Sequence, residues 1–225
     1  MTIFWHTVYI LVFIFTANWA PILLFISSLR NPRETSKVIV DKALFNLLKQ
    51  KAGIKISSIK ILNSKKFFGM MIGIPTKPIL IMSRNVYERF NKDEIEYVIL
   101  HEIGHYILGH SVKLAVLQII FIIIGLSVLL SIPTQTIYLV LAPFFAVIFG
   151  IIYIQIARIT EYEADNYALK KIKDPKGMIT ASKKFRAANT SVVVKHSLLG
   201  KLFSVGVPYS QRIKMAEWRL GEVGR

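Results

Sequence analysis

The residues best suited to chemistry lie in the run HEIGH, residues 101–105. His101 and His105 are four residues apart, so on a helix they lie one turn apart on one face. Both imidazoles can then bind a single zinc ion at about 2.0–2.1 Å. Glu102 lies beside such an ion, where it can take a proton from the attacking water and pass it to a leaving amine. The pattern predicts a zinc-dependent hydrolase with one ion per subunit; the alternative is an ordinary amphipathic surface helix.

A catalytic zinc ion needs a third protein ligand and an open position for water. The chain has no cysteine, so this ligand is a histidine or a carboxylate. His6 lies in a distant apolar segment, and His110 points about 140° away from His105 around the helix. The run RITEYEADNYA offers Glu161 and Asp165, again one helical turn apart. One can bind the ion while the other accepts a hydrogen bond from a ligand histidine; the alternative is an acidic surface patch.

Charged residues are strongly segregated along the chain, which has 225 residues, a mean hydropathy of +0.49 and a net charge of +16. No Lys, Arg, Asp or Glu occurs in residues 1–29 or 114–157. About 20 apolar residues are enough to cross a bilayer, so these segments predict membrane spans. A uniformly basic nucleic-acid-binding protein would not show such gaps, and nucleic acid is not an expected partner.

Three transmembrane helices are predicted. The first covers residues 3–29; a cleaved signal peptide is the rival interpretation, but the segment lacks a positive start and an evident cleavage site. The second uncharged segment is interrupted by SIPTQT. It therefore predicts a helical hairpin over 114–157, with spans at about 114–131 and 137–157.

Basic residues beside the spans predict the topology. Arg30 follows the first span, and Lys113 and Arg158 flank the hairpin. Because lysine and arginine stay on the cytosolic side, the N-terminus is expected outside. Residues 30–113 and 158–225 then form one cytosolic zinc metallopeptidase domain of a multi-pass protein in the cell membrane.

The two cytosolic segments predict an α+β domain. Its candidate substrate-binding strand is PILIMS, at about 78–83, which could pair with an extended peptide or serve as an ordinary core strand. The other predicted elements are a helix ending at Gly53, strands at 54–62 and within FFGMMIG, a helix from the Asn91–Glu94 capping box through His110, and helices in RITEYEADNYALKKI, after DPKG and in SQRIKMAEWRL.

HEIGH followed by EYEAD, with a membrane hairpin between them, resembles the HtpX and CAAX prenyl protease type of membrane zinc metallopeptidase. The resemblance covers roughly residues 67–215. That family's second motif is E-x-x-A-D, which implies Glu161 as third zinc ligand and Asp165 as its support. Arg158 matches an arginine of the HtpX branch, and PYSQRI resembles a C-terminal H-P-P-x-x-x-R-I signature with Arg212 on its arginine. The resemblance implies a zincin-like (gluzincin) fold and cleavage of membrane or misfolded proteins.

The chain also departs from this family. FFGMMIG stands where the family often has N-A-F-A, and Gly206 or Val207 replaces the histidine of the C-terminal signature. Candidates for transition-state or substrate contacts are therefore His196, Tyr209 and Arg212. The three predicted spans are fewer than either branch usually has.

Other classes of function fit the sequence less well than a peptidase. An intramembrane protease would carry its HEXXH motif inside a span, but FNKDEIEY before the motif is too polar. A non-catalytic, membrane-anchored basic module would bind anionic lipid or nucleic acid, and a CAAX-type peptidase would process prenylated proteins. Cytosolic orientation and nearby anionic lipid already account for the positive charge. The expected partners are thus a polypeptide substrate and the bilayer, with anionic lipid at its cytosolic face.

Overall fold

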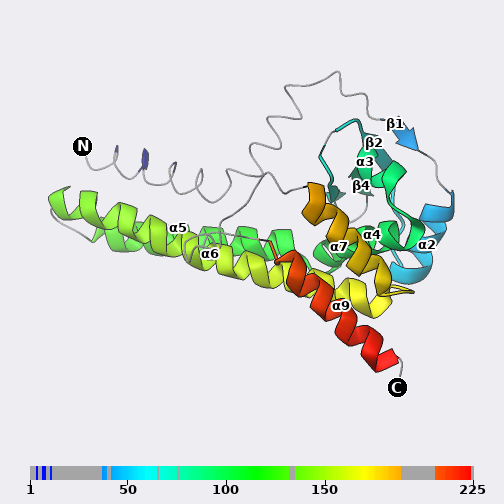
Figure 1. Cartoon of the computed structure of the whole chain (residues 1–225). Helices are drawn as coiled ribbons and strands as arrows, with labels where there is room; N and C mark the ends of the chain where they lie inside the picture. Colours follow the sequence, from blue (N-terminus) through cyan, green and yellow to red (C-terminus); the bar gives the residue numbers. More distant parts are fainter. Residues whose placement is uncertain are drawn as a thin grey trace. The chain divides into compact units, whose positions relative to one another are not determined.

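The computed structural model describes residues 4, 7, 8, 11, 37–39, 42–64, 66–74, 77–131, 135–188 and 206–223 (Figure 1). The chain divides into two compact units. One is a helical unit that includes His110–Ile159, and the other is an α/β unit that includes Arg33–Gly109, Thr160–Lys195 and Gly206–Arg225. The predicted first span lies almost entirely outside the described residues and stays a prediction.

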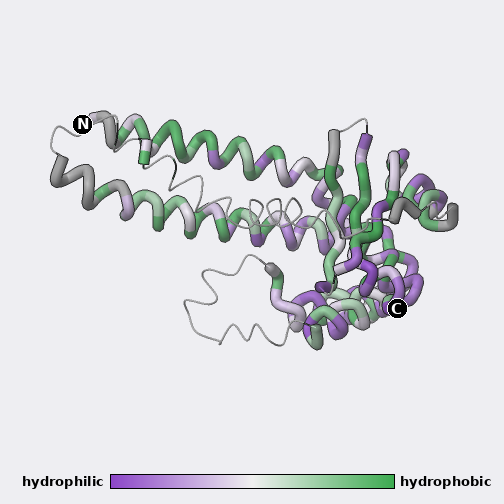
Figure 2. The backbone as a smooth tube through the Cα atoms, turned by 90° about the horizontal axis from the view of Figure 1, so that it is seen from above, coloured by the Kyte–Doolittle hydropathy of each residue, from purple (hydrophilic) through white to green (hydrophobic). Residues whose placement is uncertain are grey.

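The helical unit is built from two long apolar helices, α5 (His110–Leu130) and the first part of α6 (Gln135–Lys171). Hydrophobic residues dominate the hairpin part of both helices (Figure 2). Within the described residues, two stretches are long and apolar enough to cross a membrane: His110–Val128 and Pro143–Lys171. Inside the unit, the rings of Phe121 and Phe149 stack with centroids 4.6 Å apart.

Helix α6 differs from the prediction, because it is continuous. The sequence predicted a separate helix for RITEYEADNYALKKI after the second span, yet α6 runs unbroken to Lys171. The run from Arg158 to Lys171 contains no glycine or proline, so nothing in it ends a helix.

The α/β unit contains a four-stranded sheet in the order β1-β2-β4-β3. Strands β2 and β4 pair in parallel, and the other two pairings are antiparallel. The prediction that PILIMS could receive a substrate is wrong: it forms β4, which is hydrogen-bonded to strands on both sides. The two edge strands of this sheet are β1 and β3. The strands span Lys37–Ile39 (β1), Ser58–Leu62 (β2), Gly69–Ile74 (β3) and Lys77–Ser83 (β4).

Within the described part of the chain, five further helices accompany the sheet, and several of them were predicted from the sequence. The first of these ends at Gly53, which has a φ of 69° that favours glycine. The short helix that follows β4 was not predicted. The helices are α2 (Lys42–Ala52), α3 (Arg84–Arg89), α4 (Lys92–Ile107), α7 (Lys176–Ala188) and α9 (Tyr209–Val223).

Helix α4 carries HEIGH and has well-defined ends. At its start, Asn91 Oδ1 accepts the Glu94 N–H at 2.9 Å, and Glu94 Oε2 accepts the Asn91 N–H at 2.8 Å. This is the predicted capping box. The helix was expected to continue through His110 but ends at Ile107, because Gly109 adopts a left-handed φ of 66°.

The hydrophobic core fixes α4 in the α/β unit. Ile99, Leu100 and Ile103 of α4 are fully buried in one cluster with Leu80 and Met82 of β4. Burying side chains of this size stabilises the fold by about 1.5–3 kcal/mol each relative to exposure. The histidines of HEIGH are therefore held by a helix with little freedom to rotate.

Candidate metal centre

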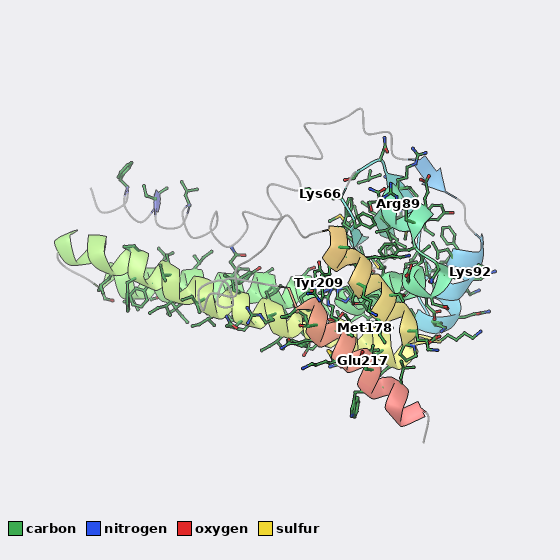
Figure 3. The ribbon with its side chains drawn as sticks, in the orientation of Figure 1. Lys66, Arg89, Lys92, Met178, Tyr209 and Glu217 are labelled. Atoms are coloured by element: carbon green, nitrogen blue, oxygen red, sulfur yellow. The ribbon has the colours of Figure 1, made fainter. Side chains whose placement is uncertain are left out.

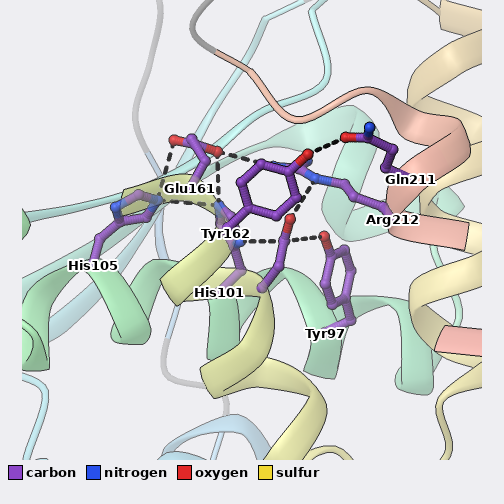
Figure 4. A network of polar contacts seen from close by, with 8 residues as sticks. Tyr97, His101, His105, Glu161, Tyr162, Gln211 and Arg212 are labelled. Atoms are coloured by element: carbon purple, nitrogen blue, oxygen red, sulfur yellow. Dashed lines mark hydrogen bonds and ion pairs between the residues drawn. The ribbon is translucent and has the colours of Figure 1, made fainter. Parts of the chain in front are cut away.

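Three potential metal ligands converge in the α/β unit. His101 and His105 come from α4 and Glu161 from α6, and their ligand atoms all lie within 4.8 Å of one another (Figure 4). The two Nε2 atoms are 3.2 Å apart. The carboxylate oxygens of Glu161 lie 3.5 Å from His101 Nε2 and 3.3 Å from His105 Nε2.

These spacings fit a tetrahedral zinc ion. Ligands at about 2.0–2.1 Å from a tetrahedral ion are separated by about 3.4 Å. The donor set, two imidazoles and one carboxylate, is also one that catalytic zinc sites use. The residues present therefore fit the metal that the sequence predicted.

Small residues allow the two ligand-bearing helices to approach. A Cβ atom on Gly104 would lie 3.1 Å from the Ala164 Cα and 3.2 Å from the Ala164 carbonyl oxygen. Both distances are shorter than ordinary van der Waals contact, so Gly104 has almost no room for a side chain. Ala164 is the alanine of EYEAD, which explains physically why a small residue suits that position.

Asp165 supports the site from a fully buried position. Its Oδ1 accepts hydrogen bonds from the Tyr97 hydroxyl and from His101 Nδ1, both at 2.8 Å. A carboxylate only accepts, so Nδ1 carries a proton, and Nε2 is the nitrogen that faces His105 and Glu161 and that would bind a metal once it is deprotonated.

Arg212 of α9 joins the two carboxylates. Its Nε donates to Asp165 Oδ2 at 2.8 Å, and its Nη2 donates to Glu161 Oε2 at 2.9 Å. Burial lowers the pKa of Arg212, but Tyr97 and both carboxylates outweigh that effect and raise it. Figure 4 shows Arg212 reaching from α9 toward Glu161, so α9 fixes the orientation of both acidic side chains.

The cluster has a strongly negative character. Burial lowers the pKa of His101, but hydrogen bonds to Asp165 and Glu161 outweigh it and raise the pKa to about 10. A site that stabilises a positive imidazole so strongly also stabilises a bound cation. Glu102 differs: burial raises its pKa to about 6, although His101 and His105 lower it. A carboxyl group with this pKa is suited to accept and release a proton near neutral pH.

Glu102 faces a pocket of about 350 Å³. Behind it, a Cβ atom on Gly69 of β3 would lie 2.9 Å from Val98 Cγ1 and 3.3 Å from Glu102 Cγ, so the edge strand passes directly against the glutamate. The pocket thus joins the metal ligands, the candidate base and the edge of the sheet. It is lined by Phe67, Phe68, Gly69, Tyr97, Val98, His101, Glu102, His105, Glu161, Phe185, Tyr209 and Arg212.

The other predicted site residues occupy different places. Tyr209, at the start of α9, lines the pocket (Figure 3). Arg158 belongs to the helical unit, where its Nη1 donates to Gln155 Oε1 at 3.1 Å, and its supporting role stays a prediction. His196 lies outside the described residues. Glu163, the middle glutamate of EYEAD, is exposed and is not part of the ligand cluster.

Two polar contacts at the site were missed by sequence reasoning. Tyr97 lies one turn before His101 on α4, so its position on the ligand face could have indicated its contact with Asp165. The Tyr162 hydroxyl donates to Gln211, which links α6 to α9 beside Arg212. That second contact joins residues far apart in sequence, and no local pattern signals it.

Comparisons with known proteins agree with this geometry. The model of Peptidase family M48 matches residues 33–219. A protein named "Protease HtpX homolog" from Bacteroides fragilis (strain YCH46) is 28% identical over 189 residues, covering 72% of this chain and 58% of the relative. "Protease HtpX" from Acinetobacter baylyi is 38% identical over 72 residues, covering 32% of this chain and 24% of the relative. The chain thus spans well under two thirds of these relatives' length.

A solved structure shares the fold. The crystal structure of S. mikatae Ste24p matches with a TM-score of 0.66 and 17% sequence identity, over 96% of this chain and 58% of that one. At this identity the match concerns the fold alone, in which a small sheet accompanies many helices. Since the family model covers most of the sequence, the chain belongs to peptidase family M48.

Proposed function

We propose that this protein is a zinc-dependent metalloendopeptidase. The observation that carries the proposal is the placement of His101, His105 and Glu161 at the separations of a tetrahedral zinc site, with Glu102 beside them on α4. The same arrangement supports a zincin-like (gluzincin) domain, because both histidines and the base share one helix and the third candidate ligand is a glutamate.

The residues of the site have distinct roles in this proposal. Zinc bound there would supply Lewis-acid polarisation of the scissile carbonyl and lower the pKa of water. Glu102 takes the proton from the attacking water and delivers it to the leaving amine. Asp165 and Arg212 hold His101 and Glu161 in place through the hydrogen bonds described above.

In this proposal the substrate backbone pairs with β3. This strand is an edge of the sheet and passes against Glu102, so an extended peptide that paired with it would lie beside the reacting groups. Tyr209 lines the same pocket and is proposed to contact the substrate or the developing oxyanion. Arg212 and His196 keep their predicted place as further candidates for such contacts.

The proposal also covers the membrane location of the protein and the class of substrate that it cuts. The apolar helices α5 and α6, together with the predicted first span, would make the protein a multi-pass membrane protein. Lys113 and Arg158 beside the hairpin favour a cytosolic catalytic domain in contact with anionic lipid. Membrane proteins or misfolded proteins are then the expected substrates, as in HtpX-like quality control.

Comparison of wild type with Glu102→Gln in cells tests this function. The variant keeps the zinc ligands and loses the proton carrier, so substrates should accumulate bound to it and be cut only by the wild type. Capture of the same proteins in equal amounts and equal lengths by both forms would contradict the proposal. A reporter fused to the C-terminus tests the topology, and a signal from the outer side would contradict the cytosolic orientation.

A further inference from the structure

Aromatic side chains form one wall of the pocket that holds the candidate metal centre. Phe67 and Phe68 lie just before β3, and Phe185 comes from α7; all three line the pocket. The Phe67 and Phe185 rings meet edge to face, with centroids 6.5 Å apart and planes at 77°. Because the contact joins the start of the edge strand to α7, this wall is part of the folded core.

Phe90 packs against the rings of Phe67 and Phe185 and stabilises their positions. Phe90 is buried, and its ring centroid lies 5.7 Å from that of Phe67 and 5.3 Å from that of Phe185. Lys184 Nζ lies 5.1 Å above the Phe90 ring and donates to Glu94 Oε2 at 2.6 Å. These contacts fix α7 against the start of α4, and Phe185 with it.

The backbone of Phe68 is also held. Ser83, a fully buried residue at the end of β4, donates its N–H to the Phe68 carbonyl at 3.0 Å. The Ser83 hydroxyl accepts the Phe68 N–H at 3.3 Å. Phe67 and Phe68 therefore start the edge strand from a defined position, as a preorganised binding surface requires.

The lining of the pocket combines these aromatic rings with the charged and metal-binding groups of the site. The charged or metal-binding side chains of the lining are His101, Glu102, His105, Glu161 and Arg212, and the remaining residues are apolar, aromatic or glycine. The phenyl rings themselves offer no hydrogen-bond partner to a charged substrate side chain, which would lose water against them. A large apolar side chain would replace water there at no such cost.

We propose that Phe67, Phe68 and Phe185 form a specificity subsite for a large apolar side chain beside the scissile bond. The inference deepens the proposed peptidase function and rests on it for the meaning of "scissile". The substrates favoured are chains with exposed aromatic or aliphatic residues, which unfolded proteins supply.

The test measures binding, so it does not depend on turnover. Zinc-loaded Glu102→Gln protein is titrated with short fluorescein-labelled peptides that differ only in carrying Phe, Ala or Asp on both sides of the central bond. The Phe peptide should bind about tenfold tighter than the Ala peptide, the scale on which apolar pockets discriminate. The Asp peptide should bind most weakly.

Substitutions of the phenylalanines then test whether these side chains cause the preference for the Phe peptide. Adding Phe67→Ala or Phe185→Ala to the Glu102→Gln protein should bring the Kd values of the Phe and Ala peptides to within about twofold of each other. Phe45→Ala is the matched control, because Phe45 of α2 packs against the same core but does not line the pocket. The protein with Phe45→Ala should still bind the Phe peptide about tenfold tighter than the Ala peptide.

The outcomes separate the two proposals. Equal affinity for the three peptides, or no binding of any of them, overturns the subsite. This comparison uses only the Glu102→Gln protein, so it does not depend on whether the phenylalanine variants fold. A preference that persists in both Phe67→Ala and Phe185→Ala also overturns it. A protein that prefers Phe but whose wild type cuts no peptide keeps the subsite and contradicts the peptidase function. A protein that cuts all three peptides equally supports the peptidase function and contradicts the subsite.

Discussion

Replacing Asp165 with asparagine should weaken the metal site although the residue touches no substrate. Asp165 is fully buried and accepts hydrogen bonds at 2.8 Å from Tyr97, His101 and Arg212. Asparagine has the same shape but offers a single acceptor oxygen and an NH2 group. Whichever way the amide turns, one donor on the protein faces another donor.

The substitution Asp165→Asn should lower both the folding stability and the zinc affinity. Breaking a buried charge pair by neutralising one partner costs about 3–5 kcal/mol of folding stability, because the remaining charge stays buried. Arg212 keeps Glu161 as a partner at 2.9 Å, so we expect the lower end of that range, about 3 kcal/mol. Losing the group that fixes the tautomer of a ligand histidine typically weakens metal binding by about 10–100-fold.

Zinc affinity is measured in detergent by competition with a chromophoric chelator, and thermal unfolding is followed in the same detergent. The matched control is Glu163→Gln, the same chemical change two residues earlier on α6 at an exposed position outside the ligand cluster. That control should leave both quantities nearly unchanged. Zinc affinity for Asp165→Asn within about twofold of wild type, with an equal unfolding midpoint, would refute the reasoning.

Three further substitutions test two parts of the site and one ion pair outside it. Gly104→Val places atoms against the α6 backbone, where even a Cβ would lie at 3.1 Å, so α4 and α6 must separate and zinc should bind at least about tenfold more weakly. Gly69→Val pushes on Glu102, with a Cβ 3.3 Å from its Cγ, so peptide cleavage should fall about tenfold or more while zinc is retained. Lys51→Met leaves Glu96 buried without its cation, so thermal unfolding should show a loss of about 2–3 kcal/mol, less than for a fully buried pair, with zinc affinity unchanged.

Control variants separate these effects from general damage. Gly221→Val in α9 has no atom within 4 Å of its Cβ position, so it should affect neither zinc binding nor cleavage. Lys49→Met removes an exposed lysine from the same helix as Lys51 and should leave the unfolding midpoint in place. Equal losses in a variant and its control would mean that the specific contact is not the cause.

Local patterns predicted the parts of the site that lie on single helices. The four-residue spacing of His101 and His105 places both imidazoles on one face, and the same rule pairs Glu161 with Asp165. The Asn91 cap predicted where α4 begins. Each of these signals depends only on neighbours within one or two turns.

Features set by pairing between distant segments were not predictable. PILIMS has the composition of a strand, but only the strand order decides that β4 lies inside the sheet and that β3 is one of its two edges. The motif PYSQRI indicated Arg212 as a site residue, but its hydrogen bonds to Asp165 and Glu161 depend on the docking of α9 and had no signal in the sequence. Helix α6 was divided at the expected membrane boundary, yet a helix does not end where hydropathy changes unless a residue breaks it.

The central claim is that His101, His105 and Glu161 hold zinc and that Glu102 uses it to cut peptide bonds. The most direct measurement titrates metal-free protein with zinc and follows bound metal and peptide cleavage in the same sample. Cleavage in the wild type should rise with zinc and saturate at one ion per chain. Glu102→Gln should bind that ion without cutting, and Glu161→Ala should bind it far more weakly. Full cleavage by Glu102→Gln, or stoichiometric zinc retained by Glu161→Ala with unchanged affinity, would contradict the account.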